Sequence, residues 1–557
     1  MIIGLDVGGT HADAVLLSEQ GVVKNIKVPT DASNLFNTVL TCFNLLLDST
    51  DISKVKRVVI STTLTTNSVV QRNLDTVGII VSAGPGIDPM NFKRGEHYYP
   101  VSGSIDHRGR EVQPIDAGEI AAICEEMKQA GIRYVGVIGK FSPRNPAHEL
   151  KIKSLINDDF DPVFLGHRVS GNLNFPRRIS TVFLNTSVYS LHRNFFNAVS
   201  DTLKQKGLTI PIQILKADGG TMNLATSMEF PGQTVLSGPA ASVMGAIPHA
   251  PTDMDSLVLD IGGTTTDIAI LVNGAPLLEP VGIGRGKYKS LIRALQTISK
   301  GIGGDSEVTV KNKKLKIGPH RRGPAMAFGG PSPTPTDAMI YLGKMEDGER
   351  VLAEKAIAMT ASKLEVPNLE AAQMIFHETC ARIVEMTRKM VDQINSKPVY
   401  TVHEFLEGYQ INPRKILLLG GPASFMAEKI QELSGIETIA LPMSSVANAI
   451  GAALARTTCE ISLMADTEQG MVYIPEENYS EKISPKYQKS DALETARIFL
   501  ERKAIMSGAS QENLETELIE FQEFNIVRRF SMHGKIFRIK MQVKPGLIKD
   551  FSLAAIL

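Results

Sequence analysis

Residues 257–272, LVLDIGGTTTDIAILV, decide the fold of this chain, because residues 2–17, IIGLDVGGTHADAVLL, repeat their pattern. In both stretches an apolar run leads to Asp, one apolar residue and Gly-Gly-Thr, and a later Asp opens a second apolar run. Aligning the two copies places Asp6 opposite Asp260. The copies lie about half the chain apart, which predicts two related halves that each begin with the same element.

Each copy is predicted to be a β-hairpin. Apolar, β-branched runs flank a Gly-Gly turn, and glycine permits a positive φ and the close approach of another group to the backbone. Consecutive N–H groups of such a turn can form an anion-binding nest. The hydroxyl groups of Thr10, Thr264 and Thr265 add donors, and Asp13 and Asp267 follow the two turns at matching positions.

The first aspartate of each copy, Asp6 or Asp260, stands at the end of a strand that should be buried. A lone buried carboxylate is costly, and a hydrated Mg²⁺ between the two would satisfy both. Two hairpins that face each other across a cleft would then hold a polyphosphate and its metal. An ordinary hairpin turn explains one such copy well, but it explains two copies with matched aspartates poorly.

Composition limits the class of protein. At 557 residues the chain exceeds one domain, and 43% hydrophobic residues with a mean hydropathy near zero are typical of a globular protein with large cores. Equal numbers of acidic and basic residues give no reason to expect nucleic acid or an anionic membrane as a partner. Four scattered cysteines without a CxxC pair, no signal segment and no long apolar run predict a cytoplasmic protein.

The first half alternates between strand and helix patterns, which predicts a mixed or parallel sheet. A polar stretch that includes Thr63 and Asn67 follows a predicted strand directly, and strand ends of this kind line ligand crevices in α/β proteins. The predicted elements are a helix at 34–48, strands at 55–62, 77–84 and 134–141, a long helix at 179–206 and a strand at 211–222 that ends in Asp218-Gly219-Gly220.

The second half contains two short helices of small residues, predicted at 239–247 and 446–455, that can pack closely. A buried strand at 415–425 runs into Gly420-Gly421-Pro422, and a long helix is predicted at 369–395. Residues 300–335 are rich in Gly, Pro and basic residues and should form loop or exposed hairpin.

The last hundred residues differ in character. A helix is predicted at 491–506, and Ile539, Met541 and Val543 alternate with polar residues as in a strand. His533-Gly534 is predicted to be the hairpin turn before that strand. This region is predicted to be an appended α+β piece.

Five elements now stand in order: DVGGT, SGPAAS followed by GA, DIGGTTTD, LLLGGPAS and VANAIGAALA. In this order they resemble the actin, Hsp70 and sugar-kinase superfamily of ATPases. The resemblance implies a two-lobed, actin-like α/β core of duplicated ribonuclease H-like halves, with a small α+β C-terminal extension. The implied domains are residues 1–235, residues 236–458 and residues 459–557.

The resemblance narrows further, to the A-type, ATP-using subunit of the hydantoinase/oxoprolinase family. It rests on STTLTTNSVV (61–70), KFSPRNPAHE (140–149), ADGGTM (217–222), TVLSGPAASVMGA (234–246), LDIGGTTTDIAI (259–270) and PTPTDAMIYLG (333–343). This implies ATP-dependent hydrolysis of a cyclic amide (a hydantoin, 5-oxoproline or a related lactam) by phosphorylation of the amide oxygen. It also implies Mg²⁺ and a B-type partner subunit, and a homo-oligomer is possible. The family's HTVGAGGGS-like stretch is TISKGIGGDS here, at 297–306.

The resemblance also implies roles for individual residues. Catalysis is expected at Asp6, Asp260 and Asp267, of which Asp6 and Asp260 would hold the metal, whereas Asp267 either orients a threonine, acts on water or has only a post-hairpin role. Substrate contacts are expected at Thr63, Asn67, Asp218 and Gly219. The expected ATP-binding residues are Gly8, Gly9, Thr10, His11, Gly238, Gly262, Gly263, Thr264, Thr265, Gly420 and Gly421.

Two other functions fit the same core. One is a small-molecule kinase that releases a stable phosphorylated product. The other is a nucleotide-switched binding module without catalysis, which the chain favours less because no β-domain with a helical lid is evident. The segment GIGRGKYKS (282–290) is not a P-loop, since Tyr288 follows Lys287 where Ser or Thr is required.

Overall fold

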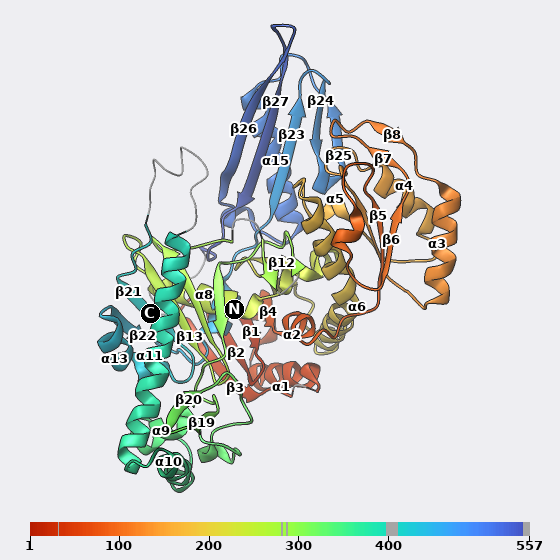
Figure 1. The fold of residues 1–557 in the computed structure, drawn as a ribbon. Helices are drawn as coiled ribbons and strands as arrows, with labels where there is room; N and C mark the ends of the chain where they lie inside the picture. The colour runs from red at the N-terminus through yellow and green to blue at the C-terminus, as the bar shows by residue number, and fades with distance from the viewer. Residues whose placement is uncertain (32, 49, 280–281, 286–287, 397–409, 550–557) are drawn as a thin grey trace.

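A twisted mixed sheet built on the first hairpin forms the core of the first lobe (Figure 1). The computed structural model describes residues 1–31, 33–48, 50–279, 282–285, 288–396 and 410–549. Strand β1 pairs antiparallel with β2 and parallel with β4, and β4 pairs parallel with β11. The sheet order is β12-β11-β4-β1-β2-β3, with strands β1 (Ile2–Val7), β2 (His11–Ser18), β3 (Gly21–Pro29), β4 (Arg57–Thr62), β11 (Ile212–Leu215) and β12 (Thr221–Asn223).

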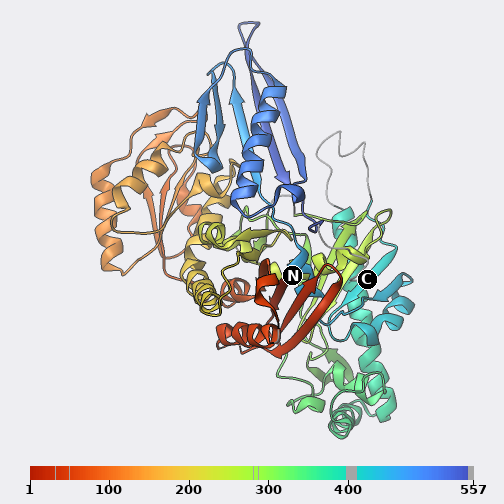
Figure 2. The ribbon, with the colours of Figure 1, turned by 180° about the vertical axis from the view of Figure 1, so that it is seen from behind.

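The second lobe repeats this arrangement, and the two lobes lie side by side when the molecule is seen from behind (Figure 2). Strand β13 pairs antiparallel with β14 and parallel with β21, which pairs parallel with β22. The predicted duplication of two α/β halves is therefore confirmed. The strands are β13 (Ser256–Ile261), β14 (Thr266–Val272), β15 (Ala275–Pro276), β18 (Thr297–Lys300), β21 (Lys415–Leu419) and β22 (Glu437–Ala440).

Two short helices of small residues, α8 (Ser237–Ala246) and α14 (Ala447–Leu454), cross between the sheets. A Cβ on Gly451 would lie 2.2 Å from the backbone nitrogen of Gly245, and a Cβ on Gly245 would lie 2.3 Å from the carbonyl oxygen of Ala447. The helix backbones therefore touch, which only residues without a side chain permit. Both helices match the sequence prediction.

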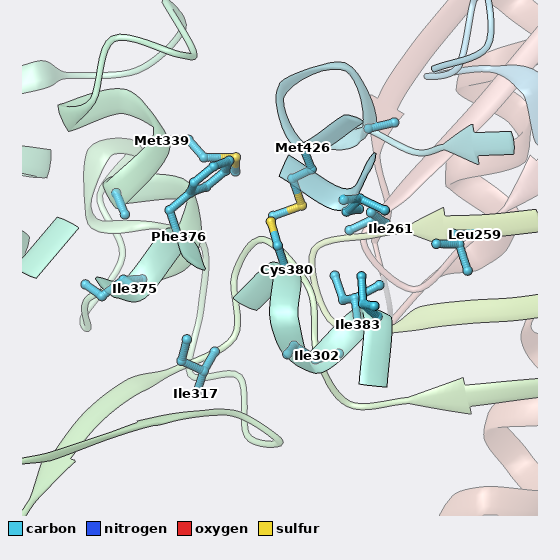
Figure 3. Packing of buried hydrophobic residues seen from close by; sticks show 14 of the residues in the cluster. Leu259, Ile261, Ile302, Ile317, Met339, Ile375, Phe376, Cys380, Ile383 and Met426 are labelled. Atoms are coloured by element: carbon cyan, nitrogen blue, oxygen red, sulfur yellow. The ribbon is translucent and has the colours of Figure 1, made fainter. Parts of the chain in front are cut away.

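Long helices cover the outer faces of the lobes. In the second lobe, Cys380 and Ile383 of α11 point toward Met426 and Ile261, in a core that joins helices to the sheet (Figure 3). The helices of the first lobe are α1 (Leu35–Leu47), α2 (Leu64–Gln71), α6 (Phe175–Gln205) and α7 (Leu224–Glu229), and those of the second are α9 (Pro335–Tyr341), α10 (Arg350–Leu364), α11 (Asn368–Asn395) and α13 (Ala423–Ser434).

A second small α/β unit interrupts the first lobe. Its sheet is parallel throughout, in the order β10-β9-β5-β6, which bears out the predicted strand-helix alternation. Its elements are β5 (Gly78–Ser82), β6 (His97–Val101), β7 (Ser104–Ile105), β8 (Glu111–Gln113), α3 (Ala117–Gln129), β9 (Val135–Gly139), α4 (Ala147–Ile156), β10 (Val163–Leu165) and α5 (Gly166–Val169).

The C-terminal region is an antiparallel sheet with one helix packed on it, as predicted. The order is β25-β24-β23-β27-β26, with β23 (Glu460–Asp466), β24 (Met471–Ile474), β25 (Tyr479–Lys482), β26 (Thr516–Arg528), β27 (Ser531–Val543) and α15 (Lys489–Met506). The chain then returns to the core, where Leu547 and Ile548 pack beside α14. Among the described residues no helix is both long and apolar enough to cross a membrane.

Two predicted local features, the turn at His533-Gly534 and the hairpin within residues 300–335, differ in outcome. The predicted turn at His533-Gly534 is wrong: both residues lie inside β27, and the hairpin turns at Arg529 and Phe530, whose φ values are 47° and 65°. Neither residue is a usual turn former, so no local pattern of residues marks this turn. Residues 300–335 do contain an exposed hairpin, β19 (Val308–Lys311) and β20 (Lys314–Ile317), and β16 (Gly284–Arg285) and β17 (Tyr288–Lys289) precede it.

The helix crossing yields a test. Replacing Gly451 with Val would place side-chain atoms where the backbone of α8 already lies, so we expect the free energy of unfolding to fall by about 3 kcal/mol or more. The matched control is Gly421→Ala, because a Cβ there would meet no atom within 4 Å. Chemical denaturation of both variants checks this. Equal stability of Gly451→Val and the parent protein would show that the helices do not cross this closely.

Candidate nucleotide site

The two Gly-Gly-Thr turns have the same geometry. The Gly8 backbone N–H donates to the His11 carbonyl oxygen at 3.0 Å, and the Gly262 N–H donates to the Thr265 carbonyl oxygen at 2.9 Å. Asp6 lies opposite Asp13 in the first hairpin, and Asp260 lies opposite Asp267 in the second. Each turn stands at the carboxyl end of a central strand, where α/β sheets bind ligands.

Asp6 is a buried carboxylate whose hydrogen-bonding capacity is only partly used by the described residues. The residue is 5% exposed, and within the described part of the chain its Oδ1 accepts no hydrogen bond. Burial, as the largest cause, together with the nearby carboxylates of Asp13 and Asp260 raises the pKa of Asp6 to about 7. Because the Asp260 carboxylate is one of these causes, the first aspartates of the two lobes lie within electrostatic reach of each other.

Asp260 is held by the two crossing helices. Its Oδ2 accepts hydrogen bonds from the Ser242 hydroxyl of α8 at 2.6 Å and from the Asn448 amide of α14 at 3.0 Å. These two hydrogen bonds hold the Asp260 carboxylate in place, and neither of them involves its Oδ1. A Cβ on Gly420 would lie 2.9 Å from the Asp260 Oδ1 and 2.2 Å from the Ile261 carbonyl oxygen. The loop after β21 therefore packs closely against the end of β13 and the Asp260 carboxylate.

Asp13 is the third carboxylate of the group. Lys27 Nζ lies 2.7 Å from Asp13 Oδ1 and donates a second hydrogen bond, at 3.0 Å, to the Ser445 carbonyl oxygen. Burial raises the pKa of Asp13 to about 6 in spite of the Lys27 charge. Lys27 therefore links the first hairpin to the loop that leads into α14.

These residues fit a hydrated Mg²⁺. Magnesium keeps several waters and binds through one or two carboxylates, and Asp6 supplies a buried oxygen without a partner. Among the described residues no group of three or more His, Cys, Asp or Glu side chains is arranged to hold a metal by protein ligands alone. The set is thus suited to a cation that arrives with a ligand such as a polyphosphate.

Several predicted backbone contacts are open to a ligand. A Cβ on Gly9 or Gly421 would meet no atom within 4 Å, and a Cβ on Gly238 would meet only the Thr63 side chain, at 3.6 Å. Thr10, Thr264 and Gly263 complete the two turns beside them. Gly420 has a φ of +91°, in the left-handed region that favours glycine.

The predicted substrate residues separate into two places. Thr63 lies at the first turn, where its N–H donates to the Val7 carbonyl oxygen at 3.0 Å and its hydroxyl accepts from the Asn67 amide at 3.3 Å. Asp218 belongs to a different, buried group: its Oδ2 accepts from the Thr458 hydroxyl at 2.8 Å. The adjacent Gly219 has a φ of +78° and packs against Met244 of α8.

Two protein-family models match this chain. Residues 2–160 match the hydantoinase/oxoprolinase N-terminal region, and residues 178–461 match the hydantoinase/oxoprolinase domain. The chain belongs to the hydantoinase/oxoprolinase family. The family resemblance inferred from the motifs is therefore confirmed.

Three characterised proteins are similar to this chain. The acetophenone carboxylase gamma subunit of Aromatoleum aromaticum is 24% identical over 99% of this chain and 81% of its own length. The caprolactamase subunit alpha of Pseudomonas jessenii is 24% identical, with 66% of this chain and 58% of that subunit covered. The 5-oxoprolinase of Saccharomyces cerevisiae is 23% identical over 100% of this chain, which spans only 49% of that protein.

Two solved structures share the fold. The ATP-dependent caprolactamase from Pseudomonas jessenii aligns with a TM-score of 0.71 at 19% identity, over 99% of this chain and 88% of that one. The nucleotide-free acetone carboxylase aligns with a TM-score of 0.73 at 15% identity, again over 99% and 88%. At these identities the alignments support the shared fold.

The stretch that departs from the hydantoinase/oxoprolinase pattern lies directly on the second turn. The Gly304 and Asp305 N–H groups donate to the carbonyl oxygens of Gly262 and Gly263 at 2.9 and 2.7 Å. The Asp305 carboxylate, paired with Arg321 at 3.0 Å, occupies the space beside Gly263. Burial and Lys27 lower the pKa of His11, with Asp305 opposing, so the side chain of His11 lies within electrostatic reach of this pair. The motif pattern marked residues 297–306 as a departure from the family, but it did not predict the ion pair between Asp305 and Arg321.

The carboxylate group yields a pH test. A folded-state pKa of about 7 for Asp6 exceeds the ordinary value of about 3.9, so the folded protein keeps a proton that the unfolded chain releases. The free energy of unfolding should therefore fall as pH rises from about 4 to 7, by up to about 4 kcal/mol. Asp6→Asn should remove most of this loss. In the absence of metal and nucleotide, the variant should therefore be more stable than the parent, and this gain should be larger at pH 8 than at pH 5.

Thermal unfolding of the parent and the variant across this pH range provides the measurement. The control is Asp201→Asn, an exposed carboxylate on α6, which should follow the parent at every pH. A parent and an Asp6→Asn variant with parallel stability curves would mean that Asp6 is ionised in the folded protein throughout.

Proposed function

We propose that this chain is the ATP-using A-type subunit of an amidohydrolase that opens a cyclic amide. The observation that carries the proposal is the pair of matching turns whose first aspartates, Asp6 and Asp260, lie within electrostatic reach of each other across the lobes. Membership of the hydantoinase/oxoprolinase family and the names of the caprolactamase and 5-oxoprolinase relatives support the reaction class.

The nucleotide would lie between the lobes. The N–H groups of Gly8–Thr10 and Gly262–Thr264 would hold the phosphates, with His11, Thr265 and Gly238 beside them, as backbone nests and helix starts do for anions. The open Gly421 and the left-handed Gly420 would lie against the adenosine. Asp6 and Asp260 would hold Mg²⁺, which when bound neutralises charge on the phosphate oxygens.

The reaction balances without a further reagent. The amide oxygen attacks the γ-phosphorus, the bond to the β-phosphate oxygen breaks and ADP leaves. Water then adds to the activated carbon, and the ring C–N bond breaks as nitrogen takes a proton, which leaves an acyl phosphate. A second water attacks the carbonyl carbon of this acyl phosphate, and phosphate leaves with the former amide oxygen. Thr63 and Asn67 would orient the acceptor, and Asp267 would orient a threonine or the water. Positioning and charge neutralisation are the main requirements of phosphoryl transfer.

A partner subunit belongs to the proposal. Because the chain spans 49% of 5-oxoprolinase, a B-type polypeptide would supply the remaining half. The relatives named subunit alpha and gamma also come from multi-subunit enzymes. We further propose a cytoplasmic enzyme, with self-association as an additional possibility.

A second candidate is ATP-dependent carboxylation of a ketone. The 99% coverage by the acetophenone carboxylase gamma subunit favours it. ATP would there phosphorylate the enolate oxygen of the ketone, whose neighbouring carbon then forms the new C–C bond, so the same turns would serve. The small-molecule kinase remains the third reading and differs in its stable phosphorylated product.

Isotope transfer separates these functions. The chain, alone and with a B-type subunit, is incubated with ATP and a lactam labelled with ¹⁸O at the carbonyl. We expect lactam-dependent ADP formation and ¹⁸O in the released phosphate, because the phosphorylated oxygen leaves with phosphorus. Asp260→Asn should lower the rate at least about 100-fold, whereas Asp201→Asn on the surface of α6 should not change it.

The other outcomes contradict the proposal. A phosphorylated compound that accumulates without phosphate release would indicate a kinase. ADP formation that depends on a ketone and bicarbonate but not on any lactam would indicate a carboxylase. ATP binding without turnover in any of these mixtures would indicate a binding module.

A further inference from the structure

An ion pair formed by two loops of the second lobe stands beside the second Gly-Gly-Thr turn. Arg321 Nη2, from the loop after β20, lies 3.0 Å from Asp305 Oδ2, from the loop between β18 and β19. The three atoms nearest to a Cβ built on Gly263 all belong to Asp305, and the closest of them is Oδ2 at 2.6 Å. The Asp305 carboxylate therefore lies directly against the turn to which the proposed function assigns a phosphate.

The loop that carries Asp305 is fixed to this turn by its backbone. The Gly304 and Asp305 N–H groups already donate to the turn, and the Thr266 hydroxyl of β14 donates to the Ile302 carbonyl oxygen at 2.7 Å. At the start of α9, both the N–H and the hydroxyl of Thr336 donate to the Gly304 carbonyl oxygen at 2.8 Å. The side chain of Asp305 thus starts from a fixed point beside the turn.

The loop that carries Arg321 is held against the same segment. The Glu307 N–H donates to the His320 carbonyl oxygen at 2.8 Å, and the Gly318 N–H donates to the Glu307 carbonyl oxygen at 2.9 Å. These two hydrogen bonds join the end of β20 to the residues that follow Asp305. The Arg321 guanidinium is therefore brought to the second turn by the backbone on both sides of the ion pair.

Arg321 has donors that Asp305 does not use. The hydrogen bond to Asp305 involves one nitrogen of the guanidinium, and within the described part of the chain the buried Nε of Arg321 donates no hydrogen bond. The side chain is 25% exposed. A guanidinium carries five N–H groups in a rigid fork that matches carboxylate and phosphate oxygens. Most of this fork is thus left for a second anion.

The ion pair also lies within reach of the first turn. Burial is the main cause that lowers the pKa of His11, and the charges of Arg321 and Asp305 act on the same side chain in opposite directions. His11 directly follows the first Gly-Gly-Thr sequence. Lys27, the other cation that acts on His11, is already paired with Asp13 at 2.7 Å. Arg321 is therefore the cation best placed to serve a ligand held between both turns.

A phosphate on the second turn would conflict with the Asp305 carboxylate. The N–H groups of Gly262–Thr264 favour an anion, whereas Asp305 puts a negative charge at the same place, and like charges repel strongly at a half-buried site. The family stretch ends in GAGGGS and this chain has GIGGDS, which puts Asp305 where the family has glycine. The conflict is relieved when the guanidinium of Arg321 binds the phosphate, because it brings the compensating positive charge.

We propose that Arg321 is a further phosphate-binding residue of the nucleotide site and that Asp305 is its counter-ion in the ligand-free protein. When the nucleotide binds, the guanidinium turns from the carboxylate to the phosphate on the second turn or bridges the two. Asp305 then acts as a selective element, because it disfavours any anion that does not engage Arg321. The inference rests on the proposed function, since it takes the second turn to hold a phosphate of ATP.

Calorimetric titration of the full-length chain with Mg²⁺ and the non-hydrolysable ATP analogue AMP-PNP tests the inference. Arg321→Met should weaken binding at least about ten-fold, because the phosphate loses a cation and meets an unpaired carboxylate. Asp305→Asn should tighten binding at least about three-fold, because a like charge is removed and the guanidinium is released. The variant with both changes should bind within about three-fold of the parent, since the pair as a whole carries no net charge.

The matched control is Arg322→Met. Arg322 is the next residue of the same loop, and its Nε lies 2.8 Å from Glu307 Oε1, so this change removes the same charge but breaks a different ion pair. The control should bind AMP-PNP like the parent protein. If Arg321→Met is too unstable to titrate, Asp305→Asn and the double variant still decide the question, because neither leaves an unpaired carboxylate beside the turn.

Two results would overturn the inference. One is equal binding of AMP-PNP by Arg321→Met and Arg322→Met, which would mean that Arg321 does not contact the nucleotide. The other is weaker binding by Asp305→Asn than by the parent, which would mean that Asp305 holds the cation or supports the loop. A purely structural ion pair would weaken binding in both single variants, so it cannot produce the opposite signs that we expect.

The inference and the proposed function fail separately. Tighter AMP-PNP binding by Asp305→Asn without lactam-dependent ADP formation would reject the amidohydrolase and leave the inference standing. Lactam-dependent release of labelled phosphate with unchanged AMP-PNP binding by Arg321→Met would reject the inference and leave the function standing. No binding of AMP-PNP to the parent or to any variant would overturn both.

Discussion

The contact between α8 and α14 is the constraint on which the rest of this structure depends. The two helices approach until a Cβ on Gly451 would lie 2.2 Å from the Gly245 nitrogen. Only at this distance do Ser242 and Asn448, from different helices, reach the same oxygen of Asp260. The helix crossing therefore determines both how the lobes meet and where the carboxylate of the second turn points.

The carboxylates between the lobes work against the stability of the ligand-free protein. Burial raises the pKa of Asp6 to about 7 and that of Asp13 to about 6, and Lys27 is paired with Asp13 as a counter-charge. Desolvated carboxylates close to one another favour protonation or a bound cation. A site of this kind gains stability when a cation and its phosphates arrive, which is a physical reason for two lobes to close on a nucleotide.

The C-terminal region makes specific contacts with the rest of the chain. Thr458 binds Asp218 of the first lobe, Lys216 donates to the Thr458 carbonyl oxygen at 2.7 Å, and the chain returns to pack Leu547 beside α14. Asn478, in this same region, reaches His167, which in turn contacts the fully buried Glu149. These contacts hold the C-terminal region against the first lobe and the inserted α/β unit.

The sequence by itself determined the duplicated hairpins, the two helices of small residues and the family, because each is encoded by neighbouring residues: Asp, Gly-Gly and Thr at fixed spacing, or Gly and Ala in one short run. It also placed Thr63 and Asn67 directly after a strand, and because that strand, β4, pairs with β1, its end lies beside the first turn. Only the tertiary structure decided that Asp218 binds Thr458, that Asp305 pairs with Arg321 over the second turn, and that the guanidinium of Arg293 makes no hydrogen bond to any described residue. Those pairs join residues from different elements, and the turn at Arg529-Phe530 likewise lacks a local signal. Their positions depend on how the sheets pack, which no local pattern of residues specifies.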